Sequence, residues 1–221
     1  MLATVVTLCF GLFLGLRHTF EPDHLAAVST LVTARPRASI GAAIIGAVWG
    51  IGHGASLLAV GLILGLFRAQ LPAHLGEIFE LAVAAMLVVL GGRSLFQCFV
   101  ARRSSSCSLT EAAADHDHAS RVSRWPLLVG MVHGLAGSGA LTALAMASLP
   151  SLRAQLAYMG LFGLGCVMGM AAMTALASWP LHRMTERHWA ARFAMGMTGG
   201  VSLLLGIGQA APSLAHLAAW Q

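Results

Sequence analysis

Residues 40–66 read IGAAIIGAVWGIGHGASLLAVGLILGL, and this stretch decides the fold of the chain. It runs for 27 residues without aspartate, glutamate, lysine or arginine, and His53 is its one ionisable side chain. An α-helix needs about 20 predominantly apolar residues to cross the hydrocarbon core of a bilayer. The stretch therefore predicts a transmembrane helix with a histidine inside it.

The composition extends this interpretation to the whole chain. Of the 221 residues, 57% are hydrophobic and 10% are charged, whereas soluble domains usually carry about 25% charged residues. Further apolar runs lie at residues 2–33, 78–100, 126–149, 154–179 and 193–210. We therefore predict an all-α, polytopic membrane protein with about six transmembrane helices and no separate catalytic domain. The first run has no basic start and no small-residue cleavage site, which favours a span over a signal peptide.

The basic residues predict the topology. All 13 are arginines; nine lie in the first, third and fifth predicted loops and two in the second and fourth. Because cytoplasmic loops carry the excess of arginine, the odd loops are expected in the cytoplasm and both termini outside. This predicts a multi-pass protein of the cell membrane, either a plasma membrane or a bacterial inner membrane. The arginines are scattered between apolar runs, which argues against nucleic acid as a partner.

Three short patterns occur twice, in the same order in each half of the chain. Their offsets are 115, 113 and 108 residues. The pairs are residues 15–18 with 130–133, 50–53 with 163–166, and 91–95 with 199–203. Ordered matches at a nearly constant offset predict an internal duplication.

The duplication predicts an inverted repeat, because each half holds an odd number of spans. We expect a first three-helix repeat over residues 1–100, a cytoplasmic linker over residues 101–124 and a second three-helix repeat over residues 125–221. The first helix of each repeat is expected to be broken, at Glu21-Pro22 in one half and in the glycine-rich residues 133–139 in the other. Substrate sites of many secondary transporters lie near the midplane on such interrupted helices.

The most informative stretch is His18-Thr-Phe-Glu-Pro-Asp23-His24. Ionisable groups inside a membrane span are costly unless they pair or bind something. On a straight helix Asp23 and His24 would point about 140° and about 240° away from His18, too divergent for one small ion. Pro22 interrupts the helix and lets the three side chains converge. Two imidazoles and a carboxylate suit Ni²⁺, Co²⁺ or Zn²⁺ better than Mg²⁺ or Ca²⁺.

A plainer interpretation of this stretch is a self-neutralising group, in which Arg17 pairs with Glu21 four residues later and Asp23 only orients a histidine. We expect the pair between Arg17 and Glu21 in either case. Metal ligation by His18, Asp23 and His24 is the hypothesis that we carry forward.

Two other histidines belong to the candidate site. His53 lies between Gly52 and Gly54, where a neighbouring helix can approach the backbone closely. It is expected to ligate or relay a metal ion, with an interhelical hydrogen bond as the alternative. His133 corresponds to His18 in the second repeat but lacks a following Asp-His pair, so it is expected on the ion's path or among the ligands.

A polar loop between the two halves carries the sequence Asp115-His116-Asp117-His118. A short His/Asp tract can bind metal weakly and could hand ions to a metal-accepting protein in the cytoplasm. A solvated linker is the simpler interpretation of this loop.

These motifs make the sequence similar to the nickel/cobalt transporter family, in its short NicO or UreH-like branch. His18, Asp23 and His24 reproduce the family signature H-x4-D-H in identity and spacing. Gly52-His53-Gly54 resembles a second family motif, and residues 133–141 (HGLAGSGAL) resemble an element of the UreH-like branch. The resemblance implies transition-metal transport, with His18, Asp23 and His24 essential and His53 contributory.

The resulting prediction is a permease that takes up Ni²⁺, or Co²⁺, as its substrate and uses no resident cofactor. Efflux by the same architecture is the nearest alternative; exporters in related families often carry longer histidine-rich loops, which favours uptake here. An intramembrane enzyme is a more distant alternative, since H-x4-D also occurs in glycerolipid acyltransferases and clustered histidines occur in membrane di-iron oxygenases. The several H-x-x-(x)-H boxes typical of a di-iron enzyme are absent from this sequence.

Overall fold

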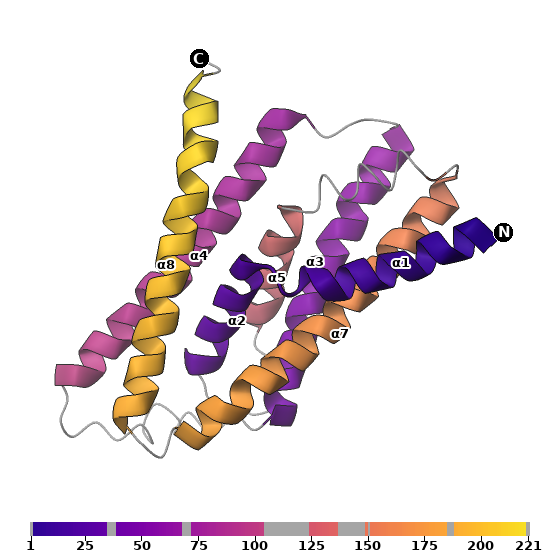
Figure 1. Ribbon diagram of the computed structural model, residues 1–221. Coiled ribbons are helices and arrows are strands. Elements are labelled where there is room, and N and C mark those ends of the chain that lie inside the picture. The colour runs from indigo at the N-terminus through magenta and orange to yellow at the C-terminus, as the bar shows by residue number, and fades with distance from the viewer. Residues whose placement is uncertain are drawn as a thin grey trace.

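The computed structural model describes residues 2–34, 39–67, 72–103, 124–136, 149, 151–184 and 188–219. In these ranges the chain is helical, with no strand. The helices are α1 (Leu2–His18), α2 (Pro22–Ala34), α3 (Ser39–Phe67), α4 (Ala73–Arg103), α5 (Arg124–Leu135), α7 (Leu152–Met184) and α8 (His188–Ala219). In Figure 1, α5 lies at the centre, between the pair α4 and α8 on one side and the pair α3 and α7 on the other.

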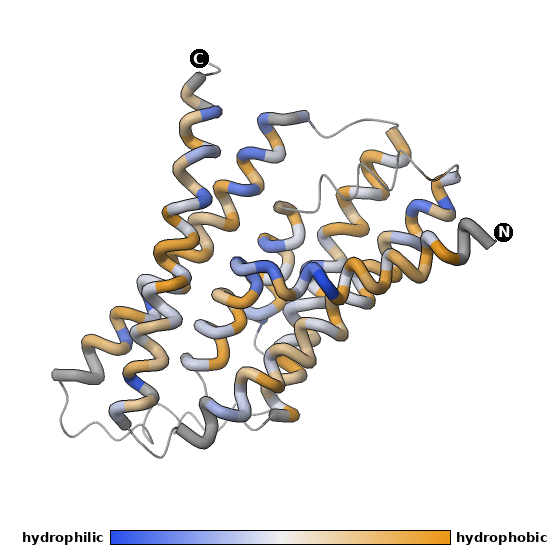
Figure 2. Tube along the Cα trace, viewed as in Figure 1, coloured by the Kyte–Doolittle hydropathy of each residue, from blue (hydrophilic) through white to orange (hydrophobic). Residues whose placement is uncertain are grey.

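Four of these helices are long and apolar enough to cross a bilayer. The qualifying segments are Ile40–Phe67, His74–Phe99, Leu152–Pro180 and Arg192–His216. Figure 2 shows hydrophobic residues along most of their length. The all-helical prediction is confirmed, and the chain is a helical membrane protein. The predicted spans 40–66, 78–100, 154–179 and 193–210 lie inside α3, α4, α7 and α8, which extend beyond them at both ends.

The first predicted span is two helices, as the sequence indicated. The helix α1 ends at His18, where the amides of Phe20 and Glu21 donate hydrogen bonds to the carbonyls of Arg17 and His18 (3.0 and 3.1 Å). Pro22 then opens α2, the first helical position, at which its missing N–H costs nothing. Figure 2 shows this junction as a hydrophilic spot in the middle of the apolar bundle.

The fourth predicted span, residues 126–149, is described only in part. The helix α5 ends at Leu135, inside the glycine-rich segment where a break was predicted. The remainder of that segment lies outside the described residues, as does the linker loop with His116 and His118. Twelve residues of helix reach only about 18 Å, so α5 by itself is too short to cross the hydrocarbon core.

The helices pack through glycines in contacts that occur in matched pairs. A Cβ atom on Gly15 of α1 would collide with the carbonyl oxygen of Phe162 on α7. A Cβ atom on Gly130 of α5 would collide in the same way with the carbonyl oxygen of Trp49 on α3. These two contacts interchange when residues are shifted by the predicted offsets of 115 and 113. Thus α1 lies on α7 as α5 lies on α3.

The pair α4 and α8 follows the same rule. The hydroxyl of Ser94 donates a hydrogen bond to the carbonyl of Met195 (3.0 Å), and that of Ser202 donates to the carbonyl of Leu87 (2.9 Å). The two bonds interchange at the predicted offset of 108 residues. Such reciprocal contacts are what a two-fold relation between the halves requires, while the boundaries at residues 100 and 125 stay a prediction.

Candidate metal centre

The junction between α1 and α2 brings the three residues of the H-x4-D-H motif together. His18 ends α1, whereas Asp23 and His24 lie in the first turn of α2. The ring centroids of His18 and His24 are 4.5 Å apart, and the side chain of His24 is 1% exposed. Since the chain turns between the helices, the side chains that would diverge on a straight helix converge here.

His53 reaches the same place from α3. Its ring centroid lies 5.3 Å from those of both His18 and His24, and the residue is fully buried. Both flanking glycines are at helix contacts: Gly52 lies against the α5 backbone, and Gly54 lies against Gly163 of α7. The two glycines therefore let α5 and α7 approach the backbone of α3 closely, as predicted, and His53 lies between these two neighbouring helices.

His133 joins the cluster from α5, in the other half of the sequence. Its Nε2 lies 2.9 Å from Oδ2 of Asp23, 110 residues away in the chain. The second carboxylate oxygen of Asp23, Oδ1, lies 2.9 Å from Nδ1 of His24 and accepts a hydrogen bond from the His24 amide (2.8 Å). Asp23 therefore links the two histidines, whose ring centroids are 4.1 Å apart.

Several nitrogen atoms of this cluster are buried and have no hydrogen-bond partner within the part of the chain that the structure describes. They are Nε2 of His18, Nε2 of His24, both ring nitrogens of His53 and Nδ1 of His133. Leaving one buried polar group unsatisfied costs about 1–3 kcal/mol, so such groups are rare and need an explanation. A metal ion that takes several of these lone pairs would remove the cost. Four imidazoles and one carboxylate are a donor set that a divalent first-row transition metal prefers.

Two aromatic rings enclose the cluster, and the sequence analysis did not find them. Trp49 of α3 lies with its ring centroid 5.7 Å from those of both His24 and His133, and Phe162 of α7 lies 5.5 Å from His18. These two residues are 113 apart, the offset of the second repeat pattern. That offset is the signal that could have found them.

The expected partner of Glu21 is replaced by another. The carboxylate oxygen Oε1 of Glu21 lies 2.8 Å from Nδ1 of His18, whereas the Arg17 side chain, its expected partner, is exposed. The short turn after His18 places Glu21 three residues from this histidine, on the outer side of the cluster. Contact with Glu21 would hold the His18 ring so that Nε2 points toward the other imidazoles.

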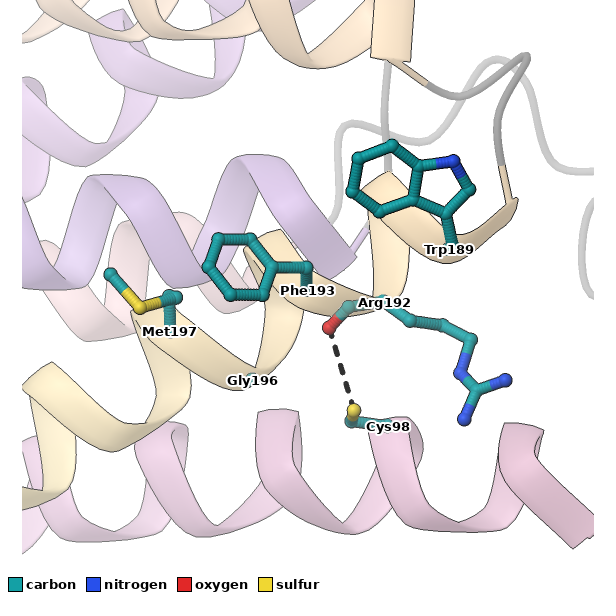
Figure 3. A pocket seen from close by; sticks show the side chains of 6 residues that line it. All are labelled: Cys98, Trp189, Arg192, Phe193, Gly196 and Met197. Atoms are coloured by element: carbon teal, nitrogen blue, oxygen red, sulfur yellow. Dashed lines mark hydrogen bonds between the residues drawn. The ribbon is translucent and has the colours of Figure 1, made fainter.

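Other polar groups lie away from the cluster. At the far end of the pair α4 and α8, Glu77 lies 3.4 Å from His216, and the hydroxyl of Ser213 bonds Glu80 (3.2 Å). The same two helices also form an open hollow of about 590 Å³. Figure 3 shows its lining: Cys98, Trp189, Arg192, Phe193, Gly196 and Met197. These residues are distinct from the five that converge at the helix break.

The chain is homologous to a urease accessory protein along nearly its whole length. It is 29% identical over 211 residues to the urease accessory protein UreH of Bacillus sp. (strain TB-90), a match that covers 93% of this chain and 90% of that protein. Two Arabidopsis thaliana proteins, chloroplast protein FOR GROWTH AND FERTILITY 2 and 1, are 29% and 28% identical over 74% and 75% of this chain. The matches span 45% and 47% of those two proteins. No family model and no solved structure matches the chain.

Proposed function

We propose that this protein carries a divalent transition-metal ion, Ni²⁺ in the first place and Co²⁺ in the second, across the cell membrane into the cytoplasm. The observation that carries the proposal is a cluster at a helix break inside an apolar bundle, made of the partly buried Asp23 and four buried histidines, His18, His24, His53 and His133. Charged and polar groups at such a depth are retained where they bind or conduct something. The ion is the substrate, and the protein is a carrier and not an enzyme.

The donor set favours nickel and cobalt over the common hard cations. Magnesium and calcium prefer mostly oxygen ligands, whereas imidazole nitrogen suits the later first-row metals. The homology to a urease accessory protein named UreH agrees with the resemblance of the H-x4-D-H motif to the UreH-like branch of nickel/cobalt transporters.

The packing of the two halves supports a carrier mechanism. His18, Asp23, His24 and His53 come from the first predicted repeat, and His133 comes from the second. Rocking of one half against the other would change the distance between Asp23 and His133, a contact of the cluster that joins the halves. The ligand set would then open toward one side of the membrane at a time.

Uptake by vesicles tests the proposal. Purified protein in liposomes is expected to accumulate radiolabelled Ni²⁺ above protein-free liposomes, with Co²⁺ as an effective competitor and Mg²⁺ as a poor one. Vesicles sorted by orientation give the direction: the predicted inward movement requires accumulation in vesicles with the outer face exposed. Metal movement equal to that of protein-free liposomes would contradict the proposal.

The topology is tested by cysteine labelling. Cysteines introduced at Leu2 and at Trp220 are each expected to react with a membrane-impermeant reagent from outside the cell, because the arginine-rich loops are predicted in the cytoplasm. A cysteine at Ser123 serves as the cytoplasmic control and is expected to react only after the membrane is opened. Labelling of either terminus only in opened cells would show that the topology is different.

The linker loop is expected to be dispensable. Deletion of residues 104–120 removes His116 and His118 and should reduce Ni²⁺ uptake by less than about 10-fold, because two loop histidines bind metal only weakly. The measurement is the initial uptake rate at equal protein content. Complete loss of uptake in a correctly folded deletion variant would place the loop in the transport path.

A further inference from the structure

The five clustered side chains form two overlapping ligand sets. In the first set, one ligand atom each from His18, His24 and His53 lies within 4.8 Å of the others. In the second set, the same holds for Asp23, His24 and His133. His24 belongs to both sets, whereas His53 and His133, with ring centroids 6.2 Å apart, belong to one each.

The two sets differ in the state of their donor atoms. In the first set Nε2 of His18, Nε2 of His24 and both nitrogens of His53 have no hydrogen-bond partner among the residues that the structure describes. In the second set Asp23 contacts Nδ1 of His24 and Nε2 of His133, each at 2.9 Å, while the other nitrogen of each ring has no partner among the described residues. An ion in the first set leaves these two contacts intact, whereas an ion that binds Asp23 through the oxygens facing His24 and His133 competes with them.

The two sets also differ in charge. Three neutral imidazoles bring no negative charge of their own to a divalent ion, although the Glu21 carboxylate lies behind His18, whereas the Asp23 carboxylate cancels one positive charge directly. The first position therefore leaves the Asp23 contacts in place but has no counter-charge among its ligands, whereas the second has that counter-charge but competes with those contacts. Opposing terms of this kind keep either position from holding the ion too tightly, which passage through a membrane requires.

We propose that the substrate ion occupies two adjacent positions in turn, a three-imidazole position (His18, His24 and His53) and a carboxylate position (Asp23, His24 and His133). The inference rests on the proposed function, that this cluster carries a transition metal. His24 stays a ligand of both positions while the other ligands exchange. One ion is bound at a time, because Asp23, the one carboxylate of the two sets, would otherwise face four positive charges.

Single substitutions separate the two positions. His53→Ala removes a ligand of the three-imidazole position, and His133→Ala removes a ligand of the carboxylate position. The probe is Co²⁺ added to the purified full chain, followed by its visible absorption spectrum and by equilibrium binding. His216→Ala is the matched control, since this histidine is 71% exposed at its side chain and lies at the end of α8.

Each of the two variants is expected to bind one Co²⁺ per chain. The spectrum of His53→Ala should come from the site that includes the carboxylate, and the spectrum of His133→Ala should come from the site of imidazoles. Uptake should fall at least about 10-fold in both, since ligand exchange is blocked. His24→Ala, which damages both positions, should lower the Co²⁺ affinity by more than about 100-fold, beyond the loss typical of an orienting residue. His53→Gln and His133→Gln repeat the comparison with side chains closer in volume if an alanine variant aggregates.

Suppose that the wild-type chain binds and transports the ion. Identical Co²⁺ spectra from the His53 and His133 variants would then overturn the two-position proposal alone, and so would wild-type uptake in either variant. If the wild-type chain neither binds Co²⁺ nor transports Ni²⁺, the proposed function fails and this inference fails with it. The control His216→Ala should match the wild type in binding, spectrum and uptake.

Discussion

Alanine in place of His18, Asp23 or His24 is expected to reduce Ni²⁺ uptake by roughly 100-fold or more. Each substitution removes a donor from a buried site, and loss of an orienting residue alone typically costs 10- to 100-fold in metal affinity. His53→Ala is expected to reduce uptake severely as well. The measurement is the initial rate of radiolabelled Ni²⁺ uptake in liposomes at equal protein content.

Asp23→Asn is the sharper variant of this group. Asparagine keeps the size and one oxygen of the side chain but deletes the negative charge that would balance a divalent ion. If Asp23 only orients His24 and His133, the loss of uptake should be intermediate; if it balances the charge of the ion, the loss should equal that of Asp23→Ala. His74→Ala, a change near the start of α4, is the matched control. Wild-type rates in the His18→Ala and His24→Ala proteins would reject the metal site.

Gly130→Ala and Gly165→Ala are expected to be among the most damaging small changes to the fold. A Cβ on Gly130 would collide with the backbone of Trp49 in α3, and one on Gly165 would collide with the backbone of Leu12 in α1. Backbone atoms cannot move aside as a flexible side chain can, so each collision must separate two helices. Overpacking typically costs 1–3 kcal/mol, and about 2 kcal/mol would lower the unfolding temperature by roughly 4–8 °C in a chain of this length.

Gly160→Ala is the matched control for these two variants. Gly160 lies in α7 like Gly165, but a Cβ there would meet no atom within 4 Å. Since alanine favours a helix over glycine by up to about 1 kcal/mol, this variant should unfold at the wild-type temperature or slightly above it. Gly130→Ala should also lose uptake, because His133 lies one turn away on the same helix. Equal unfolding temperatures for all three variants would contradict the close helix contacts.

The sequence predicted the elements whose signal is local. Residues 40–66 form a helix because they are apolar throughout, and the first span breaks at Pro22 because proline and several ionisable residues interrupt it there. The predicted spans 78–100 and 193–210 are shorter than the helices α4 and α8. An apolar run marks only the part of a helix that lies in the hydrocarbon core, whereas the helix itself can continue into polar surroundings. The helical turns beyond the hydrocarbon core contain polar residues, so the hydrophobicity of the sequence does not reveal them.

The residues of the candidate site could be predicted only where the local sequence marks them as unusual. His18, Asp23, His24 and His53 were found because ionisable groups in apolar runs are conspicuous. The contact of His133 with Asp23 joins residues 110 apart, and periodicity says nothing about such a pair. The internal repeat carried part of this information, because it made His133 the counterpart of His18 in the second half.

The most direct test of the metal centre is the nickel K-edge X-ray absorption spectrum of the purified protein after loading with Ni²⁺ and removal of free metal. The proposed site predicts one nickel per chain, with nitrogen and oxygen neighbours only and with the outer-shell scattering of several imidazole rings. In His24→Ala the retained nickel and the imidazole signal should both decrease. A protein that retains no nickel, or a spectrum of nickel surrounded by water oxygens alone, would contradict the account.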